Sequence, residues 1–186
     1  MNTRRFFIAT WLALAGFSRR ARAQVARDPI KYATLTRPVS IPIQEVATPW
    51  RPVTFVAEAM APVTATAQPR RVLISGVLFR RGNTTAGAAD APVSLEELSA
   101  LCVTCPHEQC QVDLVTDQAQ LGRMVRGTPT HPLFECGCHL SVFDAAEDGA
   151  RISGETPRGL YRFRIGAIKG DAVEITEIED VALYEV

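Results

Sequence analysis

The sequence predicts an all-β domain built from stacked antiparallel sheets. Residues 39–43 alternate apolar and polar side chains, residues 53–56 are β-branched and aromatic, and residues 72–79 form a longer apolar run. Prolines at positions 42, 49, 52, 62 and 69 interrupt the same region and exclude long helices from it. Strand signals on both sides of a cysteine-rich middle therefore favour sheets over helices.

The first 23 residues have the composition of an export signal. A paired Arg4-Arg5 precedes an apolar run over residues 6–17, and a small-x-small sequence ends at Ala23. Twelve apolar residues rise only about 18 Å as a helix, against about 30 Å for a bilayer core, so a stable anchor is not expected. The pattern resembles a twin-arginine signal that directs the protein to the periplasm, with an ordinary secretory leader as the alternative.

Charge is distributed unevenly along the chain. The 20 basic and 20 acidic residues cancel, but residues 1–23 hold five arginines and no carboxylate, which leaves 15 basic against 20 acidic groups afterwards. The remainder thus carries about −5, and its only lysines are Lys31 and Lys169. Because nucleic-acid binders show basic clusters, this composition excludes nucleic acid as a partner.

The elements flanking the middle are short. Residues 24–37 are interpreted as a tether, with an edge strand near residues 32–35 as the alternative, and the glycine-rich stretch 81–92 as a surface loop. Ser94 and Glu97 predict a capping box for a short helix that ends near Leu101. Residues 161–168 and 172–178 predict two strands joined by a tight turn.

The chemistry lies in two clusters that combine cysteine with histidine. Two of the three histidines fall inside them, and each cluster offers one Cys and one His: Cys105 with His107, and Cys136 with His139. Two thiolates and two imidazoles could hold a tetrahedral zinc ion or a two-iron two-sulfur (2Fe-2S) cluster, and the ligand types alone do not distinguish them.

The other cysteines and the third histidine need their own interpretation. Cys110 and Cys138 place one further thiol on each loop, and they could form a disulfide if the loops face each other in an oxidising compartment. Cys102 has apolar neighbours and is predicted to be a buried free thiol. His131, flanked by Pro129 and Pro132, is predicted to be a surface-loop histidine.

The segments CPHEQC (105–110) and CGCHLSVFD (136–144) resemble the two boxes of disulfide-bearing Rieske proteins, as found in cytochrome bc complexes and arsenite oxidase. The resemblance spans residues 70–178 and includes Gly149 and the GETPRGL stretch at 154–160, similar to the loop that covers the cluster in that family.

The resemblance implies a fold, a ligand set and a disulfide. It implies a Rieske fold over residues 38–186, in which a cluster-binding lobe at about 102–160 is inserted in a β base. By position, the resemblance implies that Cys105 and Cys136 bind the buried iron and that His107 and His139 bind the outer iron at the tip of the protein. It also implies a disulfide between Cys110 and Cys138.

Histidine ligation implies a reduction potential of about −150 to +300 mV. Each ligand imidazole also keeps a second nitrogen that can exchange a proton. The chain is expected to relay single electrons between redox proteins, and any catalysis belongs to a complex. A cytochrome bc-like quinol oxidase is the first choice, resting on Ser141 and the disulfide pair. The small subunit of an arsenite-oxidase-like molybdenum enzyme is the alternative, favoured by Phe143 and the leader.

A ferredoxin for a ring-hydroxylating oxygenase fits less well, because such ferredoxins lack the extra cysteines and the leader.

Other positions depart from the cytochrome bc pattern. Ser141 retains a hydroxyl that can donate to a bridging sulfide, whereas Phe143 lacks the hydroxyl of high-potential members, so a potential below about +250 mV is expected.

Three further departures affect the tip and the loop length. Glu108 and Gln109 make the tip polar, Leu140 replaces a usual glycine, and 28 residues separate His107 from Cys136, more than in cytochrome bc relatives. Glu155 and Arg158, in the stretch at 154–160, are interpreted as solvated charges, with an influence on the reduction potential as the alternative.

Overall fold

The computed structural model describes residues 29–61, 68–82, 92–127 and 129–185. The predicted leader, the first part of the tether and most of the loop at 81–92 lie outside the described residues. Within the described ranges, no helix is long and apolar enough to cross a membrane.

A six-stranded antiparallel sheet forms the base of the molecule, in the order β4-β3-β2-β1-β10-β9. Its strands are β1 (Tyr32–Pro42), β2 (Val53–Ala61), β3 (Arg70–Arg80), β4 (Leu98–Cys102), β9 (Phe163–Lys169) and β10 (Ala172–Glu179). The short helices η1 (Ile43–Val46), η3 (Leu95–Glu97) and α2 (Ala182–Glu185) accompany it. The sheet curves until its edge strands meet, with a bridge between Leu101 and Arg162.

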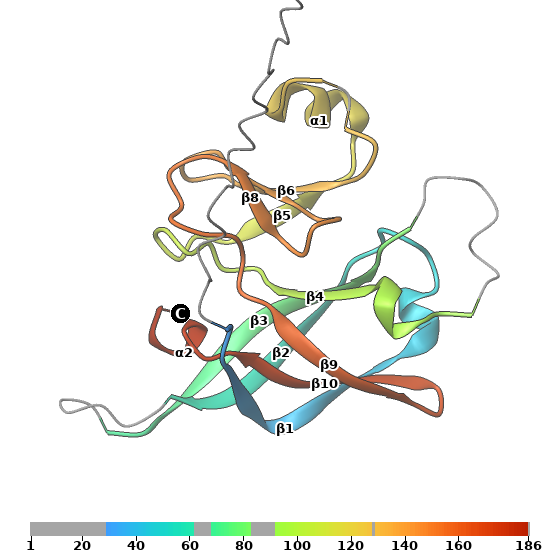
Figure 1. Ribbon diagram of the computed structural model, residues 1–186, viewed down its shortest axis with the longest axis vertical. Coiled ribbons are helices and arrows are strands. Elements are labelled where there is room, and N and C mark those ends of the chain that lie inside the picture. Colours follow the sequence, from blue (N-terminus) through green and yellow to red (C-terminus); the bar gives the residue numbers. More distant parts are fainter. Residues whose placement is uncertain (1–28, 62–67, 83–91, 128, 186) are drawn as a thin grey trace, which may run out of the picture.

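The chain between β4 and β9 forms a separate lobe that lies against the base (Figure 1). Its four-stranded antiparallel sheet has the order β5-β6-β7-β8. The elements are β5 (Val112–Val115), α1 (Gln118–Met124), β6 (Leu133–Cys136), β7 (Ser141–Asp144) and β8 (Ala150–Ser153). The predicted all-β fold, with stacked antiparallel sheets and a lobe inserted in a base, is confirmed.

The first strand begins earlier than the tether interpretation allowed. Residues 32–37 belong to β1, which pairs with β10 on one side and with β2 on the other. The alternative of a strand near residues 32–35 was therefore the better one, although the strand is central and not at an edge. The register shifts between Thr34 and Val39, and Pro38 lies in that irregular segment, where the ladder tolerates a residue without an N–H.

The predicted helix after Ser94 is shorter than expected. The capping box of Ser94 and Glu97 is present, but the helix ends at Glu97 and Leu98 is already extended. Every residue of β4 is buried and the strand pairs with β3, so tertiary packing overrides the local helical signal.

Strand β3 shows how the lobe is attached to the base. Ile74 and Leu78 contribute to the core of the base, whereas Val77 and Phe79 pack in a second core with lobe residues. The strand alternates buried and exposed residues at first and is then continuously buried from Gly76 to Arg80. Continuous burial marks a strand that is covered on both faces, so the lobe covers this end of β3.

Candidate metal centre

Strand pairing brings the two cysteine–histidine loops together. The first loop ends where β5 begins, and the second begins where β6 ends. Because β5 and β6 are antiparallel neighbours with Val112 opposite Cys136, the start of one lies beside the end of the other. Cys110 and Cys138, which are 28 positions apart in the sequence, therefore lie at the same end of the lobe.

The first loop is closed by backbone hydrogen bonds. The Cys105 N–H donates to the Cys110 carbonyl at 2.8 Å, and the Gln109 N–H donates to the Cys105 carbonyl at 3.0 Å. Gln109 adopts a left-handed backbone with φ 59°. These bonds fix Cys105 and His107 within a tight turn.

The second loop is a hairpin between β6 and β7. Cys136 pairs with Ser141 in the ladder, and the Leu140 N–H donates to the Cys136 carbonyl at 2.9 Å. Leu140 has φ 54°, in the left-handed region that favours glycine. The leucine side chain stays exposed in this conformation.

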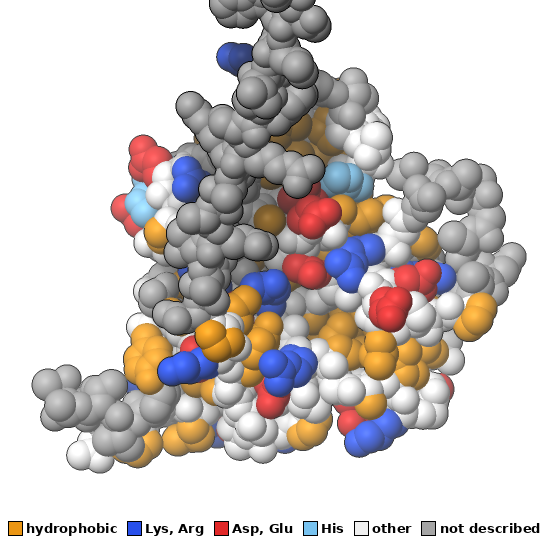
Figure 2. All heavy atoms as spheres, in the orientation of Figure 1, with side chains coloured by type: hydrophobic (Ala, Val, Ile, Leu, Met, Phe, Trp, Pro, Cys, Tyr) orange, Lys and Arg blue, Asp and Glu red, His pale blue; other side chains and the backbone are white. Residues whose placement is uncertain are grey.

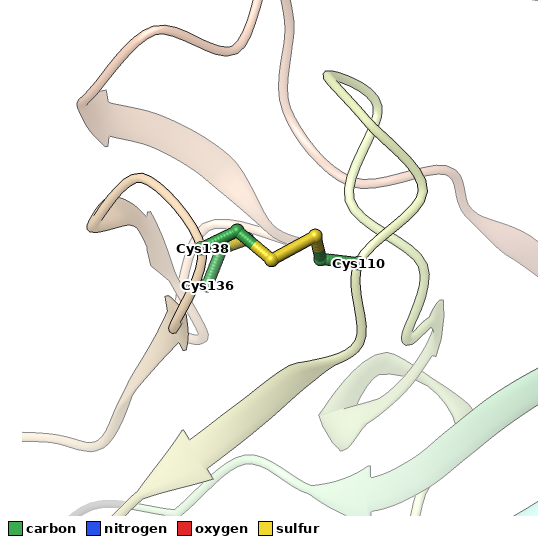
Figure 3. A group of neighbouring side chains, drawn as sticks. All are labelled: Cys110, Cys136 and Cys138. Atoms are coloured by element: carbon green, nitrogen blue, oxygen red, sulfur yellow. A yellow bond between two sulfur atoms is a disulfide. The ribbon is translucent and has the colours of Figure 1, made fainter.

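A disulfide joins the two loops, as the resemblance implied (Figure 3). Cys110 and Cys138 are bonded, with their Cα atoms 6.5 Å apart. Their sulfurs lie close to that of Cys136, and the three could be taken for a metal-ligand group. Because two of the three are oxidised to a disulfide, only Cys136 of that group offers a thiolate.

The four predicted ligands separate into a buried pair and an outer pair. Cys105 and Cys136 are each 1% exposed, whereas the His139 side chain is 37% exposed and His107 is half-buried. The imidazole centroids lie 4.8 Å apart at 75°. Burial raises the pKa of the Cys105 thiol, and the neighbouring Cys136 raises it further, so metal binding here would release a proton from Cys105.

Glu108 lies beside the two outer histidines, a contact that the sequence did not predict. Its carboxylate lies 3.8 Å from His139 Nε2, and it forms with His107 and His139 a group whose atoms could hold a metal ion. Figure 2 shows histidine side chains beside acidic ones at the surface of the lobe. The His107, Glu108 and His139 group could therefore hold a metal ion at the surface of the lobe, and the buried free cysteines Cys105 and Cys136 offer thiols in its interior.

Two buried polar atoms test whether a cofactor fits this place. Ser141 Oγ and His107 Nδ1 are buried and have no hydrogen-bond partner among the described residues. An unsatisfied buried polar group costs about 1–3 kcal/mol, so each needs a partner that protein atoms do not supply. A metal centre that binds the nitrogen and accepts from the hydroxyl would satisfy both, and the donor set fits such a group.

Phe143 and Cys102 are both buried. Phe143 is fully buried in the core that contains Cys105 and Cys136, and it has no hydroxyl to donate to them. Cys102 is a buried free thiol, which confirms that prediction, and it belongs to the core of the base, apart from Cys105 and Cys136. Burial raises the pKa of its thiol.

His131 is not the simple surface histidine that was predicted. Its Nε2 lies 2.8 Å from Asp144 Oδ1, its ring stacks on Trp50 of the base, and its side chain is only 26% exposed. The two flanking prolines suggested a loop, but the partners come from residues distant in sequence. His131 therefore joins the long loop of the lobe to the base.

Arg158 is also not a solvated charge. Its Nη2 donates to Glu179 Oε2, and Glu179 is 1% exposed at the end of β10. A β-bulge shifts the alternation of β10 between Ile175 and Glu177, so no sequence period shows that Glu179 faces inward. The exposed Glu155 agrees with the prediction of a solvated charge.

Comparison with known proteins adds no assignment. No family model matches the chain, and no curated protein matches its sequence.

Proposed function

We propose that this chain is an exported Rieske-type electron carrier that holds a 2Fe-2S cluster on Cys105, His107, Cys136 and His139. The observation that carries the proposal is the arrangement of two buried thiols beneath two outer imidazoles on loops joined by a disulfide. Sulfur would hold the inner iron and nitrogen the outer iron. When bound, the cluster accepts and releases one electron at moderate potential.

The surrounding residues have separate tasks in this proposal. Ser141 would donate its unpartnered hydroxyl toward the cluster, and Phe143 would exclude water from the cysteines without donating to them. His139 would hold a proton on Nε2, at the surface and beside the Glu108 carboxylate. Electrons would therefore pass at the tip, where the imidazole edges meet solvent.

The test is the composition of the purified protein. We expect two irons and two labile sulfides per chain, with the visible absorption and reduced-state electron paramagnetic resonance (EPR) signal of a histidine-ligated cluster. Cys105→Ser should abolish both, whereas the matched control Cys102→Ser, also at a buried free cysteine, should keep them. Zinc in place of iron and sulfide would refute the proposal.

A cytochrome bc-like quinol oxidase remains the first choice of complex, supported by Ser141 and the disulfide. The arsenite-oxidase-like alternative is favoured by two observations, the absence of a hydroxyl at Phe143 and the carboxylate of Glu108 beside the histidines. Purifying the tagged chain with its native partners separates the two. Haem b would support the first, and molybdenum would support the second.

A further inference from the structure

A buried ion-pair group connects the lobe to the base. The Glu179 carboxylate, in the base, accepts from Arg162 Nε at 2.9 Å through one oxygen and from Arg158 Nη2 through the other. Arg158 belongs to the loop 154–160 of the lobe, and its guanidinium lies 4.6 Å over the ring of Tyr161. Glu179 is thus held from both sides of the lobe–base junction.

Arg162 alone does not satisfy this carboxylate. Arg162 neighbours Glu179 in the base, where its carbonyl accepts from the Glu179 N–H at 3.0 Å, and its Nε donates to Oε1. A buried carboxylate oxygen without a donor is costly. Arg158 supplies the donor for Oε2, so the position of the lobe loop is tied to a fixed point in the base.

The same loop contacts the candidate metal centre at both of its ends. At the start, a Cβ on Gly154 would come within 2.4 Å of Ser141 Oγ, so the backbone of the loop lies directly against the unpartnered hydroxyl. At the end, Leu160 packs in the core that contains Cys105 and Cys136. The Leu160 N–H donates to the Gly149 carbonyl at 2.9 Å.

Between these ends the loop is braced around Arg158. Thr156 is 1% exposed, and its hydroxyl donates to the Arg158 carbonyl at 2.9 Å. A displacement of Arg158 would therefore be transmitted along a short braced segment to the Ser141 hydroxyl and to the cysteine core.

We infer that Arg158 is a positioning residue: its ion pair with Glu179 holds the loop 154–160 against Ser141 and so sets how the hydroxyl acts on the cluster. The inference rests on the proposed function for its effect on the cluster. Its effect on the loop depends only on the residues described above.

The chain contains a matched control for the ion pair. Arg164 of β9 donates to Glu177 of β10 at 2.5 Å, and its guanidinium lies 4.1 Å over the ring of Tyr32. It combines an ion pair with an aromatic contact, as Arg158 does, but its partners all belong to the base. Arg164→Met therefore removes the same chemistry without releasing the loop.

The decisive experiment is a double-mutant cycle read by reduction potential. Ser141→Ala should shift the potential of the cluster, and in the Arg158→Met background that shift should fall to half or less. Arg158→Lys, which keeps a cation for Glu179, should restore most of it, and the Arg164→Met background should leave it intact. Equal shifts in all four backgrounds would overturn the inference.

Hydrogen exchange of the cluster-free protein gives a second readout. The Leu160 amide should exchange at least tenfold faster in Arg158→Met than in the parent or in Arg164→Met. If Arg158→Met does not fold, Arg158→Lys carries the same comparison with a smaller increase. A parent without iron and sulfide would refute the proposed function, whereas unchanged Leu160 exchange would refute the role of Arg158.

Discussion

The base and the lobe are stabilised in different ways. The base has strands of up to 11 residues and one continuous apolar core, whereas each lobe strand has four residues and the lobe packs in two smaller cores. The lobe adds a disulfide, and it contains Ser141 Oγ and His107 Nδ1, two buried atoms without a hydrogen-bond partner among the described residues. The base is thus stabilised mainly by burial of apolar side chains. The lobe has smaller apolar cores, and a disulfide cross-links its two loops.

The largest expected effect comes from the core of the base. Leu78→Ala removes a fully buried side chain from the base and should lower the free energy of unfolding by about 2–5 kcal/mol. Because the lobe rests on β3, both parts should unfold together in thermal melts. Leu121→Ala, fully buried in the small core under α1, is the comparison and should loosen the lobe alone. A lobe that stays folded in Leu78→Ala after the base has unfolded would contradict the expectation that the lobe depends on the base.

Removing the disulfide should act on the lobe. In the double variant Cys110→Ala, Cys138→Ala, freeing a loop of this length should cost about 2–4 kcal/mol of lobe stability. Hydrogen exchange should quicken in β5 to β8 and stay unchanged in β1, β2 and β10. Cys102→Ser, in the base core, serves as the control. Equal acceleration in the base would show that the two parts do not differ as described.

Ser141→Ala should stabilise the cluster-free protein, but it should lower the reduction potential of the protein with its cluster bound. In the cluster-free protein it removes a buried hydroxyl that has no partner among the described residues, which should raise the free energy of unfolding by about 1–3 kcal/mol. With the cluster bound it removes a hydrogen bond that is stronger in the more negatively charged, reduced state, so the potential should fall. A bond worth about 1.5–3 kcal/mol sets the upper limit of the fall at about 60–130 mV. Calorimetry and voltammetry test the two signs separately, and a potential that does not fall would remove Ser141 from the site.

The smallest expected effect is the pH dependence of the capping box in the base. The Ser94 backbone N–H lowers the pKa of Glu97 below its usual value of 4.5, and Arg80 adds to this. A lowered folded pKa stabilises the fold at pH values above 4.5 and loses that contribution as the pH falls below it. Glu97→Gln should therefore weaken the protein by roughly 0.5 kcal/mol at neutral pH and less at pH 3. A larger difference at pH 3 than at neutral pH would contradict this sign.

The sequence predicted the elements whose signals are local. The runs at 53–56 and 72–79 lie in β2 and β3, and the pair at 161–168 and 172–178 corresponds to β9 and β10. The two loops of the candidate site were recognisable because their cysteines and histidines stand within a few residues of each other. The disulfide between Cys110 and Cys138 followed from the same motifs.

The interpretations that the structure corrected all concern partners distant in sequence. Residues 32–37, the first part of β1, were interpreted as a tether because the pairing with β10 cannot be read from their own side chains. His131 and Arg158 were interpreted as exposed because their partners, Asp144 and Glu179, are identified only when the strands are assembled.

By itself, therefore, the sequence determined the strand-rich class and the spacing of the thiols and imidazoles, since periodicity and motif spacing are properties of neighbouring residues. Only the tertiary structure decided the surroundings of the buried polar groups: the hydroxyl of Ser141 has no partner among the described residues, and the carboxylate of Glu179 lies between two arginines. Burial is set by which surfaces meet, and these surfaces come from strands far apart in the chain.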